Sequence, residues 1–66
     1  MSVTINGESR AFDHAPTCAD LVSELRLAGK RIAMERNGEI VPRSQFADTL
    51  LADGDKLEIV VAVGGG

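Results

Sequence analysis

Aromatic residues and cysteine are scarce in this chain of 66 residues, which has two Phe, no Trp, no Tyr and one cysteine, Cys18. Few aromatic rings leave little for nucleotide bases to stack on. A formal net charge of −3 also repels the phosphate backbone that nucleic-acid-binding proteins neutralise with Lys and Arg. One cysteine cannot form an internal disulfide. We therefore expect no nucleic-acid partner and a reducing, cytoplasmic location.

Long hydrophobic runs are absent as well. The longest, residues 59–63, is far shorter than the roughly 20 residues that span a bilayer. The first seven residues lack the basic and then apolar pattern of a secretory signal. We therefore expect neither secretion nor a membrane partner. A chain of this length predicts a single domain, residues 1–66, in which little room exists for a deep substrate cleft.

The first segment predicts a β-hairpin. Residues 3–5 and 8–12 have strand character and are joined by Asn6-Gly7, a dipeptide favoured in tight turns. A three-residue loop with a bulge is the register we predict, because it aligns two small residues with the inward side chains of the first strand. A strict two-residue turn would align two charged residues there. The small residues are Ser9 and Ala11, and the charged ones are Glu8 and Arg10.

The clearest element is a helix that begins near Thr17. Thr17 can act as the N-cap, and Asp20 three residues later can complete a capping box. Gly29 is placed to end the helix in a left-handed conformation. Apolar residues between these points form one stripe at helical spacing: Leu21, Val22, Leu25 and Ala28.

The second half of the chain predicts three further strands and a short helical turn. Residues 32–36 alternate with Ile32 and Met34 inward, and residues 40–41 form a short strand that Pro42 stops. Residues 44–51 predict a brief helical turn, followed by a turn at 53–55 and a last strand over 56–63. The buried anchors expected of the helical turn are Phe46, Leu50 and Leu51. The residues of the last strand expected to face the helix are Leu57, Ile59, Val61 and Val63.

This element order predicts an α+β domain of two layers, with a mixed sheet and one main helix. The first and last strands are expected to lie side by side and parallel, joined by a right-handed crossover. The arrangement is the β-grasp, or ubiquitin-like, fold.

The last strand leads directly into Gly64-Gly65-Gly66. Glycine is costly to order and contributes nothing to packing, so these residues predict either a frayed end or a flexible tail that another protein orders. A glycine tail can thread a narrow channel because it has no Cβ. Its carboxylate, ionised at neutral pH, could attack the α-phosphate of ATP held by a partner enzyme. A sulfur nucleophile could then convert the adenylate to a thiocarboxylate.

At this point the sequence resembles the ThiS family, the sulfur carriers of thiamine biosynthesis. The resemblance covers the whole chain and rests on residues 37–43 (Asn-Gly-Glu-Ile-Val-Pro-Arg), the Asp53-Gly54-Asp55 turn, the apolar last strand and Gly65-Gly66. It implies that Gly66 is adenylated and converted to a thiocarboxylate, while Gly64 and Gly65 thread into partner sites. The chain itself would be a carrier and not an enzyme.

The resemblance also implies the partners. They are an E1-like, ThiF-like adenylating enzyme that uses ATP and magnesium, a cysteine desulfurase or persulfide sulfurtransferase that supplies sulfur, and a ThiG-like thiazole synthase that receives it. The chain is expected to bind no cofactor or metal itself and to be a monomer.

Other residues carry weaker indications. Val60 and Ala62 would lie on the open face of the sheet beside the tail, where they could dock partners, be covered by a loop or be tolerated as surface residues. Cys18 lies at the start of the helix, where the helix dipole would lower a thiol pKa, but it has no second cysteine beside it, which favours a structural or surface role. The lone His14 predicts no metal site and is expected to be exposed.

Three alternatives stay open from the sequence. The chain could carry sulfur for molybdopterin or for cysteine synthesis. It could also be a β-grasp binding module whose terminus is not modified. Deleting Gly65 and Gly66 separates these classes, because a carrier would lose all function and a binding module little.

Overall fold

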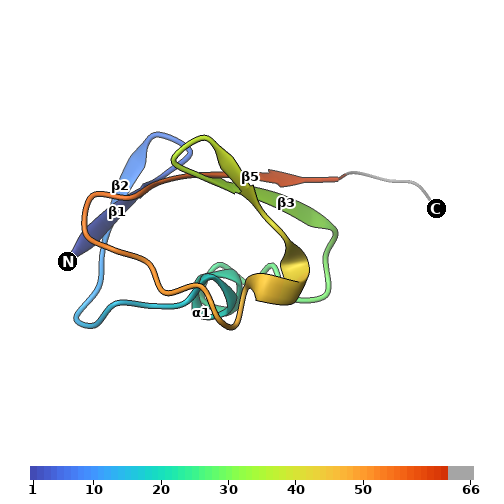
Figure 1. Ribbon diagram of the computed structural model, residues 1–66, viewed down its shortest axis with the longest axis horizontal. Helices are drawn as coiled ribbons and strands as arrows, with labels where there is room; N and C mark the ends of the chain where they lie inside the picture. Colours follow the sequence, from blue (N-terminus) through green and yellow to red (C-terminus); the bar gives the residue numbers. More distant parts are fainter. Residues whose placement is uncertain (63–66) are drawn as a thin grey trace.

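The computed structural model describes residues 1–62, which form a five-stranded sheet packed on one helix (Figure 1). The elements follow the order β1 (Ser2–Ile5), β2 (Glu8–Ala11), α1 (Cys18–Glu24), β3 (Ile32–Arg36), β4 (Glu39–Val41), the 3-10 helix η1 (Arg43–Gln45) and β5 (Lys56–Val61). The inward orientation predicted for Val63 lies outside the described residues. Within residues 1–62, no helix is long and apolar enough to cross a membrane.

The sheet has the strand order β2-β1-β5-β3-β4. The first and last strands are parallel neighbours, with Thr4 opposite Lys56 and Ile5 opposite Leu57. The other pairings are antiparallel. The α1 helix covers one face of this mixed sheet and leaves the other face open (Figure 1). The predicted β-grasp fold is therefore confirmed.

The register predicted for the first hairpin is wrong. Ile5 lies opposite Glu8 and Val3 opposite Arg10, so the turn has two residues and no bulge. Asn6 and Gly7 both have positive φ, 50° and 87°, as a two-residue hairpin turn requires. The bulge was expected to place small residues on a buried face. However, β2 is an edge strand whose residues are all exposed, so its long charged side chains reach water from either face.

The helix begins as predicted and ends earlier. The Asp20 backbone N–H donates to Thr17 Oγ1 and the Thr17 N–H to Asp20 Oδ2, both at 3.0 Å, which confirms the capping box. However, the last helical residue is Glu24, and Arg26 rather than Gly29 takes the first left-handed conformation, with φ 59°. The Leu27 N–H donates back to the Val22 carbonyl at 2.9 Å and closes the helix end. Ala28 therefore lies outside the helix and is exposed.

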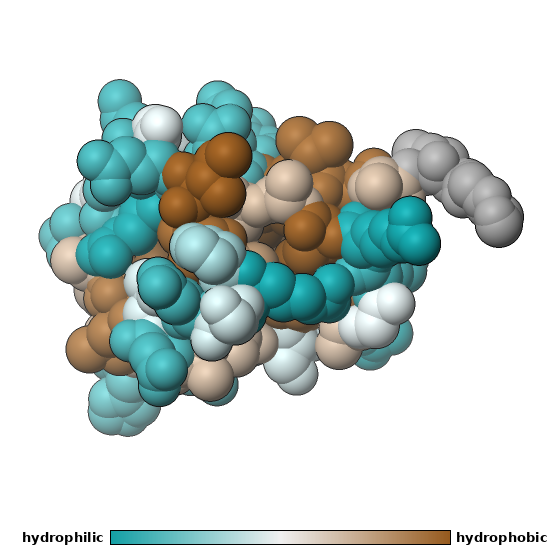
Figure 2. All heavy atoms as spheres, turned by 45° about the vertical axis from the view of Figure 1, so that its right-hand side comes forward, coloured by the Kyte–Doolittle hydropathy of each residue, from teal (hydrophilic) through white to brown (hydrophobic). Residues whose placement is uncertain are grey.

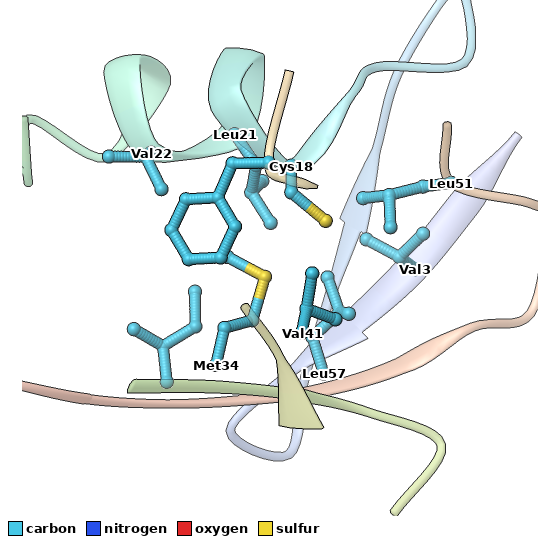
Figure 3. Close-up of a cluster of buried hydrophobic side chains, with 10 residues drawn as sticks. Val3, Cys18, Leu21, Val22, Met34, Val41, Leu51 and Leu57 are labelled. Carbon is cyan, nitrogen blue, oxygen red and sulfur yellow. The ribbon is translucent and has the colours of Figure 1, made fainter. Parts of the chain in front are cut away.

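The core lies between α1 and the sheet and consists of apolar side chains (Figure 3). Its buried members are Val3, Cys18, Leu21, Val22, Met34, Val41, Phe46, Leu51, Leu57 and Ile59. The prediction that Leu50 is buried is wrong, since its side chain is 58% exposed. Leu50 bridges Thr17 in an extended segment, where consecutive side chains point to opposite sides, so only Leu51 faces the core.

Candidate functional site

The candidate site is the end of β5 and the sheet surface beside it. The Asn6 side-chain amide holds the strand on one side by accepting from the Ile59 N–H at 2.8 Å and donating to its carbonyl at 3.0 Å. Beyond Ile59 the strand is held by β3, where Val61 pairs with Ile32 and the Ala62 N–H donates to the Arg31 carbonyl at 2.9 Å. The segment that leads toward the tail is thus anchored to the sheet up to Ala62. The predicted tail residues Gly64, Gly65 and Gly66 lie outside the described residues.

Exposed apolar side chains lie on the open face of the sheet. Alternation along β5 buries Leu57 and Ile59 against the helix and turns Val60, which is 64% exposed, to the other face. Ala62 is exposed as well. Both docking residues proposed from the sequence therefore lie on accessible surface.

Ile40 is a further apolar residue on the open face, and it was not predicted as a docking residue. It is 74% exposed and lies opposite Glu35, whereas its neighbour Val41 pairs with Met34 and is buried. The sequence pattern could have indicated this exposure. Side chains alternate along a strand, so an inward Val41 in β4 requires an outward Ile40.

The other end of the open face is acidic and hollowed. Glu35 of β3 lies directly opposite Glu58 of β5, an arrangement in which like charges repel. A hollow of about 490 Å³ opens there, lined by Glu35, Asn37, Gly38, Gly54, Lys56 and Glu58. This hollow opens at the start of β5 and borders the surface around Val60, because Glu58 and Val60 are neighbours on the open face.

A second hollow opens on the helix side of the sheet, near the end of β5. Its volume is about 340 Å³, and its apolar wall includes residues that follow α1 and residues of β5. It is lined by Ile5, Asn6, Glu8, Arg10, Leu25, Leu27, Ile59 and Val61. The short helix explains this opening, because α1 ends at Glu24 and does not extend over this part of the sheet.

Asp55 is a buried carboxylate whose hydrogen bonds connect separate parts of the fold. Its side chain accepts from Arg36 Nε at 2.8 Å, from Asn37 Nδ2 at 3.0 Å and from the Ala52 N–H at 2.8 Å. Burial opposes ionisation, but these hydrogen bonds and the Arg36 charge outweigh it, so the pKa of Asp55 lies below its ordinary value. These bonds join the turn before β5 to the β3–β4 hairpin. The turn at residues 53–55 was predicted, and this network was not.

Cys18 is structural in this fold. Its side chain is fully buried in the core, between α1 and the sheet (Figure 3). Burial raises the pKa of the Cys18 thiol, and the Arg36 charge offsets only part of this effect. The helix start therefore does not activate the thiol. His14 is exposed, as predicted. Among residues 1–62, no group of three or more His, Cys, Asp or Glu could hold a metal ion.

Comparison with known proteins points to one family. The model of the ThiS family matches residues 3–66. The sulfur carrier protein ThiS of Bacillus subtilis is 40% identical over 50 residues, which cover 76% of each chain. The crystal structure of the thiamine biosynthesis protein ThiS from Geobacter metallireducens superposes with a TM-score of 0.82 at 35% identity and covers both chains completely.

A longer relative contains a domain similar to the whole of this chain. The thiazole synthase of Paramagnetospirillum magneticum is 48% identical over all 66 residues. That match takes up 20% of the synthase, so the chain spans about a fifth of this relative's length. The thiazole synthase of Magnetococcus marinus shows the same coverage at 32% identity.

Proposed function

The chain belongs to the ThiS family, and from that premise we propose that it is a sulfur carrier in thiamine biosynthesis whose carrying group is the Gly66 carboxylate. The observation that supports this most directly is the family match, which runs to residue 66 and so includes the glycine tail. The β-grasp fold and the anchored end of β5 agree with it, since they would present a tail at the edge of a rigid domain.

The proposed chemistry takes place at the tail, within partner enzymes. A Gly66 carboxylate oxygen attacks the α-phosphate of ATP on an E1-like, ThiF-like enzyme, which forms the acyl-adenylate and releases pyrophosphate. The terminal sulfur of a persulfide then attacks the acyl carbon and AMP leaves, which gives an acyl disulfide. A thiol reduces this disulfide, and the carrier keeps one sulfur as a thiocarboxylate. The persulfide comes from a cysteine desulfurase or sulfurtransferase. Magnesium and ATP act in the adenylating enzyme, and the carrier is a co-substrate.

A thiazole synthase is the proposed acceptor. Support comes from the relatives named thiazole synthase, in which a domain similar to this chain forms a fifth of the protein. Joining a carrier domain and a synthase in one polypeptide raises their effective concentration, which would favour direct sulfur transfer between them.

The open face of the sheet is the proposed docking surface. Val60 and Ala62 are exposed beside the base of the tail. Exposed apolar residues of this kind are typical of protein contacts. Docking there would fix the direction in which Gly64 and Gly65 enter the partner's channel.

Mass spectrometry tests the carrier function. The protein is incubated with an adenylating enzyme, a persulfide donor, a thiol and ATP, and its intact mass and fragments are then measured. We expect one oxygen at Gly66 to be replaced by sulfur, only when ATP is present. Because oxidation of Cys18, Met1 or Met34 gives nearly the same mass, the change must be located in the C-terminal fragment.

Two variants serve as controls for this experiment. Deletion of Gly65 and Gly66 should abolish the mass change, whereas Cys18→Ala should retain it. A Gly66 that remains an ordinary carboxylate with several adenylating enzymes would overturn the proposal in favour of a binding module.

A further inference from the structure

Positive charge is concentrated at the end of the molecule where β5 ends. Arg26, Lys30, Arg31 and Arg43 lie there, four of the seven Lys and Arg residues in a chain of net charge −3. The segments that carry them, residues 25–34 and 40–47, contain no Asp or Glu. On the face turned forward in Figure 2, strongly hydrophilic side chains lie beside apolar ones and extend toward this end.

Hydrogen bonds link the segments that carry these residues to the last described part of the chain. The Arg31 carbonyl accepts from the Ala62 N–H at 2.9 Å. The Arg43 side chain donates to the Lys30 carbonyl at 3.0 Å and so ties η1 to the same loop. Leu25 and Leu27, on either side of Arg26, line the same hollow as Val61. Arg31 therefore lies beside the end of β5, and the other three cations come from the segments that adjoin it.

The conformation of Arg26 indicates that its side chain has a use outside the fold. Arg26 has φ 59° at the position after the helix where glycine is preferred. Asn6 and Asn37 share this conformation, but Asn tolerates it better than Arg does. Arg26 is exposed, and within residues 1–62 its guanidinium forms no ion pair or hydrogen bond. Glycine would serve the fold better at this position.

We propose that Arg26, Lys30, Arg31 and Arg43 form a cationic collar around the base of the tail, and that the collar binds carboxylates around the entrance of the enzyme that takes up the tail. This inference rests on the proposed carrier function. Four residues follow Ala62, and a chain of four residues spans at most about 14 Å. In the proposed reaction the nucleotide meets the carboxylate at the end of the tail, so the anions that meet the collar would be protein carboxylates at the entrance.

Association kinetics with the E1-like adenylating enzyme, measured first without and then with ATP, test the collar. The variants are Arg26→Gly and the double variant Arg26→Gly/Arg31→Gln. The matched control is Lys56→Gln, which removes one positive charge at the opposite end of β5. We expect the association rate constant to fall about 3-fold in the single variant and about 10-fold in the double variant at low salt. The difference should shrink at high salt because the charges are exposed.

The stability of Arg26→Gly separates a binding role from a structural one. Glycine adopts positive φ without strain, so the urea midpoint should stay equal or rise while association slows. A lower midpoint together with unchanged association would overturn the proposal. So would an effect that appears only when ATP is bound, because phosphate would then be the anion. If Lys56→Gln slowed association equally, the effect would depend on net charge alone, and the proposal would also be overturned.

Failure of the collar is distinguishable from failure of the carrier function. If the wild-type protein becomes a thiocarboxylate and Arg26→Gly/Arg31→Gln associates as fast as wild type, the collar is wrong and the carrier function stands. If the wild-type protein is never adenylated, the carrier function itself is wrong.

Discussion

Asp55 shows how one buried carboxylate connects two distant turns. It is 7% exposed and accepts hydrogen bonds from Arg36, Asn37 and Ala52. Asn37 extends the network, since its side-chain oxygen accepts from the Lys56 N–H at 2.9 Å. A buried charge is costly unless it is paired and hydrogen-bonded. Asp55 meets that condition only in the ionised form, and this links its protonation to folding.

We predict that Asp55→Asn lowers stability and changes how stability depends on pH. The pKa of Asp55 is lowered in the folded protein. Its contribution is therefore fully present above the unfolded-state pKa and is lost as the pH falls through the folded-state pKa. At neutral pH the variant should lose about 2–4 kcal/mol. Urea denaturation between neutral pH and about pH 2 measures both effects, and the loss should shrink below about pH 4.

Asp48→Asn is the matched control, because it replaces an exposed carboxylate outside this network. It should change stability by less than about 0.5 kcal/mol. Equal pH profiles for Asp55→Asn and wild type would show that the Asp55 pKa is not linked to folding.

The partners of Asp55 could not be predicted from the sequence. The turn at residues 53–55 was visible because its signal is local. Arg36 and Asn37 precede Asp55 by 19 and 18 residues, and no local pattern relates them to it. They meet only because β3 and β5 are neighbours in the sheet.

At the scale of elements, α1 shows which helix signals are reliable in this chain. The N-terminal capping box depends on Thr17 and Asp20, three residues apart, and formed as predicted. The C-terminus depends on how residues 25–27 pack against the sheet, so Gly29 was a misleading stop signal. The first hairpin illustrates the same limit. Its turn was predicted from Asn6-Gly7, but its register depends on the exposure of β2 at the sheet edge.

We predict that Thr17→Ala destabilises the protein by about 1 kcal/mol, because it removes the side chain that accepts from the Asp20 N–H. Thr17→Ser should retain most of the stability, since Ser keeps the hydroxyl. The helix has only seven residues, so it depends on its cap and on packing more than on intrinsic propensity. Chemical denaturation monitored by circular dichroism compares the variants. Equal losses for Ala and Ser would attribute the effect to the Thr17 methyl group.

At the scale of the whole molecule, the fold separates the buried core from the proposed docking surface. The core fills the space between α1 and one face of the sheet, while the other face carries Val60 and Ile40 in exposed positions. The alternation along the last strand predicted the exposed position of Val60, whereas that of Ile40 was not predicted. The sequence did not predict the collar, because Arg26, Lys30, Arg31 and Arg43 come from two segments that only the tertiary structure joins.

The last prediction concerns the open face. Val60→Asp should weaken binding to the adenylating enzyme about ten-fold or more, because it places a charge in an apolar contact that the complex would desolvate. The fold should tolerate the change, since Val60 is 64% exposed. Calorimetric titration gives the affinity, and a urea midpoint confirms folding. Val60→Ser, which adds no charge beside Glu58, should give a smaller loss in the same direction.

Leu50→Asp is the matched control for this surface. Leu50 is a large apolar residue that is 58% exposed, but it lies beside the start of α1, where it bridges Thr17. If docking uses the open face, Leu50→Asp should bind like wild type while Val60→Asp does not. Full affinity in a folded Val60→Asp variant would instead show that the enzyme recognises the tail and its base alone. The exposed valine would then be an ordinary surface residue.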